Sequence, residues 1–169
     1  MFCNAEILGL RDNVLDMNST DFDETLAVNI LGSALAIKHS ARAMVERKIR
    51  GSIISTASIE ATLVCAAPIE IRVNCISHYG IATPMVMNAF GVEKDEVNRR
   101  LEMNQNLKGE LLSTKNIVEA TLFLASDESA YISGHNLAVD GVLTSKMMTA
   151  LAKFKFMTSG ERNYLEVNL

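Results

Sequence analysis

Apolar residues recur at helical spacing through residues 20–47. Ser19 or Thr20 is a candidate N-cap, acidic residues occupy the first turn and basic residues the last. The apolar stripe comprises Leu26, Ile30, Ile37, Ala41 and Met44. This spacing predicts one long amphipathic helix, with Gly51 as its stop.

A second broad apolar stripe begins after a candidate N-cap at Thr114, in TKNIVEATLFLASDESA. It predicts a helix whose wide apolar face packs on a sheet. Between these two segments, residues 85–112 mix methionine, asparagine, glycine and charged residues, which favours one or two short helices. SGHNLAVDG predicts a short strand flanked by glycines.

Two runs, GSIISTAS and IRVNCIS, lack the alternation of a half-buried strand. They predict buried parallel strands at roughly 53–57 and 71–76, and FCNA near the start predicts the end of another strand. Alternating strands and helices predict an α/β fold with a parallel sheet. The segment between Ser58 and Glu70 is close to the shortest possible parallel crossover and shows little helical periodicity.

Composition limits the partners of the chain. The 169 residues are 49% hydrophobic and 21% charged, which fits one globular domain, and a formal net charge of -4 gives no basis for nucleic-acid or membrane-surface binding. Without a run of 18 apolar residues or a signal-peptide pattern, we expect a cytoplasmic protein. Cys3, Cys65 and Cys75 form no C-x-x-C pair and the three histidines are dispersed, so no metal site is expected.

The ordered series FCNAE, NILG, IISTAS, IRVNCIS, GIATPM, LFLASDESAYISG and NLAVDG resembles the short-chain dehydrogenase/reductases. It is most similar to the plant-type branch with secoisolariciresinol and xanthoxin dehydrogenases. The resemblance covers residues 1–145, read as an N-terminally truncated domain, and leaves 146–169 as a tail. It implies a partial NAD(P)-binding Rossmann-like fold, an NAD or NADP cofactor, and a small-molecule secondary alcohol or ketone as substrate.

The resemblance also implies particular site residues. Asn4 and Ala5 fall on the family's N-N-A-G signature, with Glu6 in place of its last glycine, and Gly80, Ile81 and Thr83 fall on the loop that lines the nicotinamide. The catalytic asparagine and serine fall on Asn29 and Ser58. In two further positions this chain departs from the family: His78 replaces a usual proline, and Val142 replaces the final glycine of V-D-G-G.

One catalytic pair of the family is absent. Its Tyr-x-x-x-Lys helix starts about thirteen residues after the serine, but that count from Ser58 reaches Ile71 in the next strand. No tyrosine of the chain is followed four positions later by lysine, and no G-x-x-x-G-x-G turn for the pyrophosphate occurs. The junction lies near Pro68, where a helix carrying the general acid is expected in this family.

Structural roles compete with the catalytic ones. Asn29 could be a buried polar residue that bonds a neighbouring backbone, and Thr83 with Pro84 could simply start a helix. For the chain as a whole, the first interpretation is an oxidoreductase homologue with impaired catalysis. Two alternatives are a non-catalytic pseudoenzyme that forms homo- or hetero-oligomers with full-length relatives through the 20–47 helix, and an unproductive splice or gene-model fragment.

Overall fold

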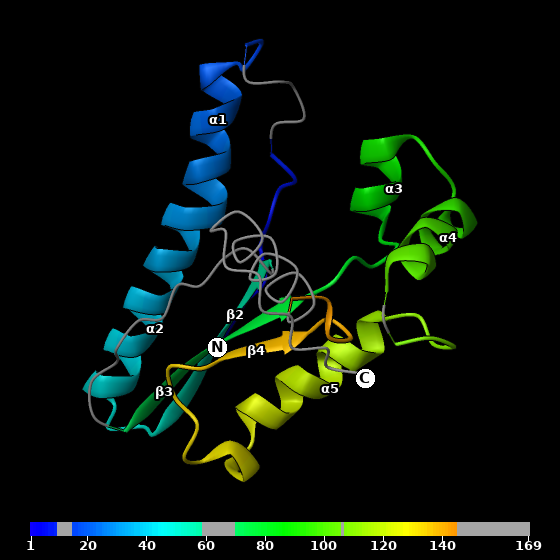
Figure 1. The fold of residues 1–169 in the computed structure, drawn as a ribbon. Helices are drawn as coiled ribbons and strands as arrows, with labels where there is room; N and C mark the ends of the chain where they lie inside the picture. The colour runs from blue at the N-terminus through cyan, green and yellow to red at the C-terminus, as the bar shows by residue number, and fades with distance from the viewer. Residues whose placement is uncertain (10–14, 59–69, 106, 145–169) are drawn as a thin grey trace, which may run out of the picture.

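The computed structural model describes residues 1–9, 15–58, 70–105 and 107–144 (Figure 1). Four parallel strands, in spatial order β1-β2-β3-β4, form one sheet. The strands are β1 (Phe2–Cys3), β2 (Gly51–Ser58), β3 (Ile71–His78) and β4 (Asn136–Val139). The predicted α/β class with a parallel sheet is therefore confirmed.

The long N-terminal helix has three parts: α1 (Ser19–Leu26), a π-helical segment η1 (Ala27–Gly32) and α2 (Ser33–Glu46). The prediction of its N-cap was wrong by one residue, because the side chain of Asn18 accepts the hydrogen bond from the Thr20 amide. The expected stop at Gly51 was also wrong. The helix ends at Glu46, the C-cap is Arg47, and Lys48 turns the chain with a positive φ of 54°.

Gly51 instead opens β2, and packing explains why a glycine stands there. A Cβ at this position would overlap the thioether of Met44 on α2. The glycine therefore leaves room for the Met44 side chain of α2 beside the start of the strand.

Helices cover the two faces of the sheet. On one face Cys3, Ile53, Ile71 and Val73 pack under Ala36, Ile37, Ala41 and Met44 of α2. On the other, Ile54 and Ile76 pack with Ile117 and Leu124 of α5 (Thr114–Ala125). Figure 1 shows α2 and α5 on opposite sides of the strands. Because β3 has a strand on each side and these helices above and below, its run Ile71–Ser77 is almost wholly buried, as its apolar sequence predicts.

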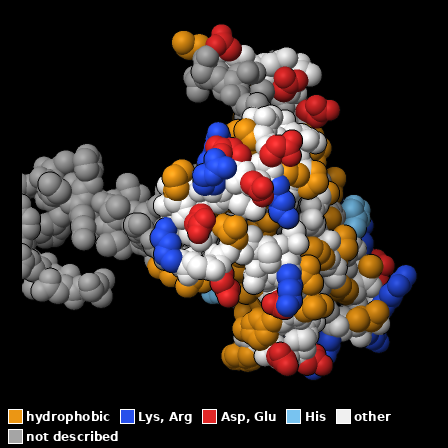
Figure 2. Space-filling model, turned by 90° about the vertical axis from the view of Figure 1, so that its right-hand side faces the viewer, with side chains coloured by type: hydrophobic (Ala, Val, Ile, Leu, Met, Phe, Trp, Pro, Cys, Tyr) orange, Lys and Arg blue, Asp and Glu red, His pale blue; other side chains and the backbone are white. Residues whose placement is uncertain are grey.

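The remaining helices are α3 (Pro84–Phe90), α4 (Lys94–Asn104) and the short 3-10 turn η2 (Asp127–Ser129). The prediction of one or two helices over 85–112 is confirmed. The α5 N-cap is Ser113, one residue before the predicted Thr114, and it forms a capping box with Asn116. Figure 2 shows the side of the molecule that carries α3 and α4, where hydrophobic and charged side chains are interspersed.

Val142, which follows β4, adopts a left-handed backbone with φ of 75°, and its side chain is exposed. A β-branched residue is strained in this region, by roughly 1–2 kcal/mol. We expect Val142→Gly to raise the free energy of unfolding by about 1 kcal/mol, because glycine removes the strain although its unfolded chain is more flexible. Urea unfolding measures the change. Val118→Gly, at an exposed position inside α5, is the control and should lower stability; a lower stability for Val142→Gly would contradict the interpretation.

Three features of the sequence interpretation lie outside the described residues. These are the connection 59–69 with its junction at Pro68, the thiol of Cys65, and the predicted boundary between residues 145 and 146 together with the tail 146–169.

Candidate functional site

The carboxyl ends of the four strands bring the predicted site residues to one edge of the sheet. Asn4 follows β1, Ser58 ends β2 and His78 ends β3; in the ladder Ser58 is the register partner of His78, and His78 that of Val139 on β4. Ligands of open parallel α/β sheets bind at this edge. The backbone of Ser58 is therefore where the resemblance implies it should be.

Asn4 is tied to the neighbouring strand rather than pointing freely outward. Its side-chain oxygen accepts a hydrogen bond of 2.6 Å from the hydroxyl of Thr56 on β2. Ala5 and Glu6 are exposed just beyond it. The carboxylate of Glu6 thus places negative charge and bulk at a position where the family has glycine.

Asn29 lies on η1 and holds the loop after β1. Its side-chain oxygen accepts from the Ile7 amide at 2.9 Å, and its side-chain nitrogen donates to the Ile7 carbonyl at 2.8 Å. Both polar groups of the amide are therefore used by one backbone residue. Asn29 is half-buried and bonds a backbone residue, as the structural alternative expects, while its predicted catalytic role stays a prediction.

The residues of the loop after β3 have structural roles in packing and helix capping, besides their predicted role in lining the nicotinamide. The Thr83 hydroxyl accepts from the Val86 amide and Pro84 is the first residue of α3, so the alternative role as a helix start is confirmed. Ile81 belongs to the buried core beside α5. A Cβ on Gly80 would overlap a terminal methyl group of Leu101, so this glycine leaves room for the Leu101 side chain of α4.

His78 stands where the family has proline, and its imidazole is only half-buried. The ring nitrogen Nδ1 lies 2.7 Å from the Tyr79 carbonyl oxygen. Unlike proline, this side chain carries ring nitrogens that can form hydrogen bonds. Sequence reasoning noted the replacement without assigning His78 a role.

A small cavity beside these strand ends was not foreseen from the sequence. It measures about 80 Å³, and its lining residues are Tyr79, Gln105, Leu107, Glu110, Leu111, Leu112, Asn116, Asp140 and Gly141. Burial raises the pKa of Asp140, but hydrogen bonds from the Thr144 side chain and the Thr144 and Val142 amides outweigh it and lower the pKa below its usual value. Ligand pockets usually measure about 300–1,000 Å³, so this cavity suits a few water molecules, not a dinucleotide.

Within residues 1–9, 15–58, 70–105 and 107–144, His, Cys, Asp and Glu side chains nowhere gather in threes in a way that could hold a metal ion. No helix in those ranges is long and apolar enough to cross a membrane.

Parallel strands with helices on both faces, and a polar edge at their carboxyl ends, define a Rossmann-like α/β protein. Comparison with known proteins specifies the family. Residues 64–144 match the profile described as enoyl-(acyl carrier protein) reductase. Short-chain dehydrogenase reductase 3b of Arabidopsis thaliana is 42% identical over 164 residues, covering 83% of this chain and 64% of the relative.

Solved structures agree with this assignment. A short-chain type dehydrogenase/reductase from Mycobacterium marinum superimposes with a TM-score of 0.71 at 26% identity, over 85% of this chain and 63% of that one. A short-chain dehydrogenase from Leptospira borgpetersenii with bound NAD+ has the same fold, with a TM-score of 0.68 at 23% identity and the same shares covered. The chain belongs to the short-chain dehydrogenase/reductase family, and it spans less than two thirds of the length of these relatives.

Proposed function

We propose that the chain is a homologue of NAD(P)-dependent oxidoreductases that act on secondary alcohols or ketones, and that its own catalysis is impaired. The observation that carries the proposal is the register of β2 against β3. From Gly51 beside Ile71 to Ser58 beside His78, the two strands pair directly, and only residues 59–70 connect them. This connection is where the family carries Tyr-x-x-x-Lys, and the chain contains no such pair.

The missing pair matters because of the chemistry of hydride transfer. Reduction of a ketone generates an alkoxide that needs a proton, and the family's tyrosine supplies it because the nearby lysine ammonium lowers the tyrosine pKa. Asn29 cannot supply a proton in this way, and it is already bonded to Ile7. Ser58 keeps its place in the ladder, but a serine hydroxyl alone is a poor acid.

The described residues fit a dinucleotide poorly. When bound, a nicotinamide cofactor supplies or accepts the hydride. Asn4, Ala5, Gly80, Ile81 and Thr83 keep the positions from which the family contacts it. Against this, the cavity at the strand ends is too small, and the Glu6 carboxylate would repel the phosphates.

Nucleotide binding tests the proposal. We expect titration calorimetry of the 169-residue chain with NAD+, NADH, NADP+ and NADPH to detect no binding at micromolar affinity, and thermal unfolding to shift little with added nucleotide. The short-chain dehydrogenase from Leptospira borgpetersenii, whose structure contains bound NAD+, is the positive control with that nucleotide. Micromolar binding to this chain would overturn the expectation of a damaged cofactor site.

A second candidate function is a non-catalytic subunit that associates with other chains of the family. It is favoured by the large apolar side chains that α1, η1 and α2 leave exposed, among them Phe22, Leu26, Ile30, Leu31 and Leu35. Exposed apolar patches of this kind mark association surfaces in soluble proteins. Stable co-purification with a full-length relative would support this function.

A further inference from the structure

The end of α2 and the turn that leads into β2 form an exposed corner of the molecule. From Val45 to Arg50 every residue is exposed, so the chain protrudes there. Two of these residues, Val45 and Ile49, have large apolar side chains that are each 50% exposed. Basic residues surround them. We call the following set the basic corner: Arg42, Val45, Arg47, Lys48, Ile49 and Arg50.

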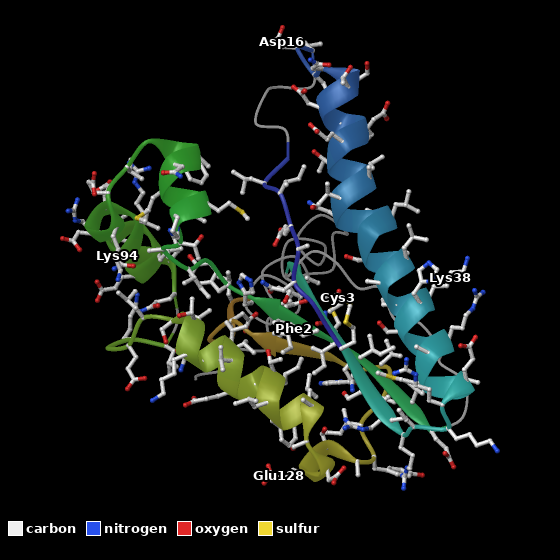
Figure 3. All side chains as sticks on the ribbon, turned by 180° about the vertical axis from the view of Figure 1, so that it is seen from behind. Phe2, Cys3, Asp16, Lys38, Lys94 and Glu128 are labelled. Atoms are coloured by element: carbon white, nitrogen blue, oxygen red, sulfur yellow. The ribbon has the colours of Figure 1, made fainter. Side chains whose placement is uncertain are left out.

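The cations at this corner have no acidic partners. Lys38 lies one helical turn before Arg42 on α2 and extends the same face of the helix. Figure 3 shows Lys38 pointing away from the sheet. Within the described ranges, the side chains of Lys38 and of the four cations of the basic corner form no ion pair and no hydrogen bond. Most other described cations contact an acceptor, namely Arg72, Arg99, Arg100, Lys108 and Lys115.

The charge of the basic corner is opposite in sign to that of the whole chain. Residues 38–50 contain five Lys and Arg residues and one acid, Glu46. The field at a protein surface is set by charges within a Debye length, about 8–10 Å, rather than by the sum over the chain. The net charge of -4 gives no basis for membrane-surface binding by the chain as a whole, but it does not describe this corner.

The backbone of the basic corner is satisfied by its own hydrogen bonds. The Lys48 amide donates to the Val45 carbonyl at 3.1 Å, and the Ile49 amide donates to the Met44 carbonyl at 2.9 Å. This pattern is a Schellman motif, in which the residue after the C-cap is usually glycine because its backbone is left-handed. Here that residue is Lys48, with φ of 54°. A strained lysine at a position that favours glycine points to a role for its charge.

We propose that the basic corner docks this chain onto an anionic lipid surface. Each Lys or Arg close to such a surface is attracted by its negative potential, and Val45 and Ile49 can enter the boundary between headgroups and acyl chains. Satisfied backbone groups lower the cost of that entry. A protruding corner suits a flat bilayer, whereas proteins bind peptides in grooves or along sheet edges. The docking does not depend on any redox activity.

The position of the basic corner leaves the candidate site in water. The corner precedes β2 and so lies at the amino ends of the strands, whereas Asn4, Ser58 and His78 lie at their carboxyl ends. Figure 1 shows the end of α2 and helix α3 at opposite ends of the sheet. Asp127 and Glu128 follow α5, which covers the other face of the sheet. An anionic surface repels these two carboxylates, so the α2 side turns toward the bilayer.

Flotation of the full chain with lipid vesicles tests the docking, because aggregated protein does not float. At low salt we expect most of the chain to float with vesicles that contain about 30% phosphatidylserine, and almost none with phosphatidylcholine alone. Raising the salt to about 0.5 M should release the chain. Equal binding to both kinds of vesicle, or none to the anionic ones, would overturn the proposal. So would binding to soluble polyglutamate without binding to anionic vesicles, since the partner would then be an acidic protein segment.

Charge removal tests whether the basic corner makes the contact. Arg47→Ala combined with Arg50→Ala should lower the partition coefficient onto anionic vesicles by about 25-fold, which is fivefold for each charge. Lys94→Ala combined with Lys115→Ala is the matched control, because it removes the same charge from exposed positions on α4 and α5; it should change partition by no more than about twofold. The basic residues after position 144 stay unchanged in both variants: Lys146, Lys153, Lys155 and Arg162. Equal losses in the two variants, or undiminished binding in the first, would contradict docking through the corner.

Lys48→Gly separates binding from folding. Glycine suits the left-handed backbone, so we expect the melting temperature to rise by about 2–4 °C. The loss of one charge should at the same time weaken vesicle binding by about fivefold. Circular dichroism melting measures the stability of every variant. A stabilised Lys48→Gly chain that binds vesicles as tightly as the parent would remove Lys48 from the contact and count against the proposal.

Discussion

Reduction of a secondary ketone by NADH or NADPH is expected to run about 10²–10⁴-fold slower on this chain than on a family member that carries Tyr-x-x-x-Lys, which is the cost of losing a positioned general acid. Two residues that remain at the predicted site, Asn29 and Thr83, already have structural hydrogen-bond partners. Asn29 is committed to both backbone groups of Ile7, and Thr83 caps α3. Initial rates of nucleotide oxidation over a panel of secondary ketones measure the difference.

The informative control for this assay is the intact relative with its catalytic tyrosine changed to phenylalanine. That variant measures the loss caused by the missing acid alone, and this chain should be at least as slow because its cofactor site is expected to be damaged as well. The half-buried His78, at the end of β3, provides an internal check. His78→Pro restores the usual family residue, and we expect the rate of ketone reduction to stay the same because the general acid is already absent. Turnover within tenfold of the intact relative would contradict impaired catalysis.

Arg72→Ala is expected to lower the free energy of unfolding by about 3 kcal/mol or more. The guanidinium reaches from β3 to the end of α5, where it donates to the Leu124 carbonyl at 2.8 Å, the Ser129 hydroxyl at 2.7 Å and the Ser126 carbonyl at 3.0 Å. Hydrogen bonds from a charged group contribute roughly 1.5–3 kcal/mol each. The Leu124 carbonyl keeps donors in Ser52 and Ser129, so the loss is less than the sum of three bonds.

Urea unfolding of the parent, Arg72→Ala and Arg72→Lys measures this effect. Lysine keeps the charge but not the planar fork, so we expect an intermediate loss for Arg72→Lys. Arg50→Ala, at an exposed position before β2, removes the same side chain from the surface and should change stability by no more than about 0.5 kcal/mol. Equal effects at positions 72 and 50 would show that the contacts with α5 do not stabilise the fold.

The elements that sequence predicted well are those with strong periodicity and burial. The runs IIST and IRVNCIS lie in β2 and β3, because a strand that is covered by helices on both faces needs apolar side chains on both faces. The observed N-caps, Asn18 and Ser113, each lie one residue before the nearest predicted one. In residues 18–20 and in residues 113–114, every side chain is able to accept the capping hydrogen bond. Only backbone geometry selects among them.

The candidate site was predicted less completely. Family motifs placed Asn4, Ser58 and Gly80 at the correct ends of their strands, because motif order fixes topology. They did not predict that Asn29 bonds Ile7 or that Asp140 holds the turn after β4, since both depend on residues that meet only in the folded chain. The cavity lined by Tyr79 and Asp140 likewise joins segments distant in sequence.

By itself the sequence determined the α/β class, the family and the absence of Tyr-x-x-x-Lys, because periodicity, motif order and residue identity are local properties of the chain. Tertiary structure alone decided which face of the long helix stays exposed. Packing against the sheet partly buries Ile37 and Met44, while Leu31 and Leu35 of the same long helix remain exposed. Exposure is a property of the whole fold, since it depends on what lies on the other side of each residue.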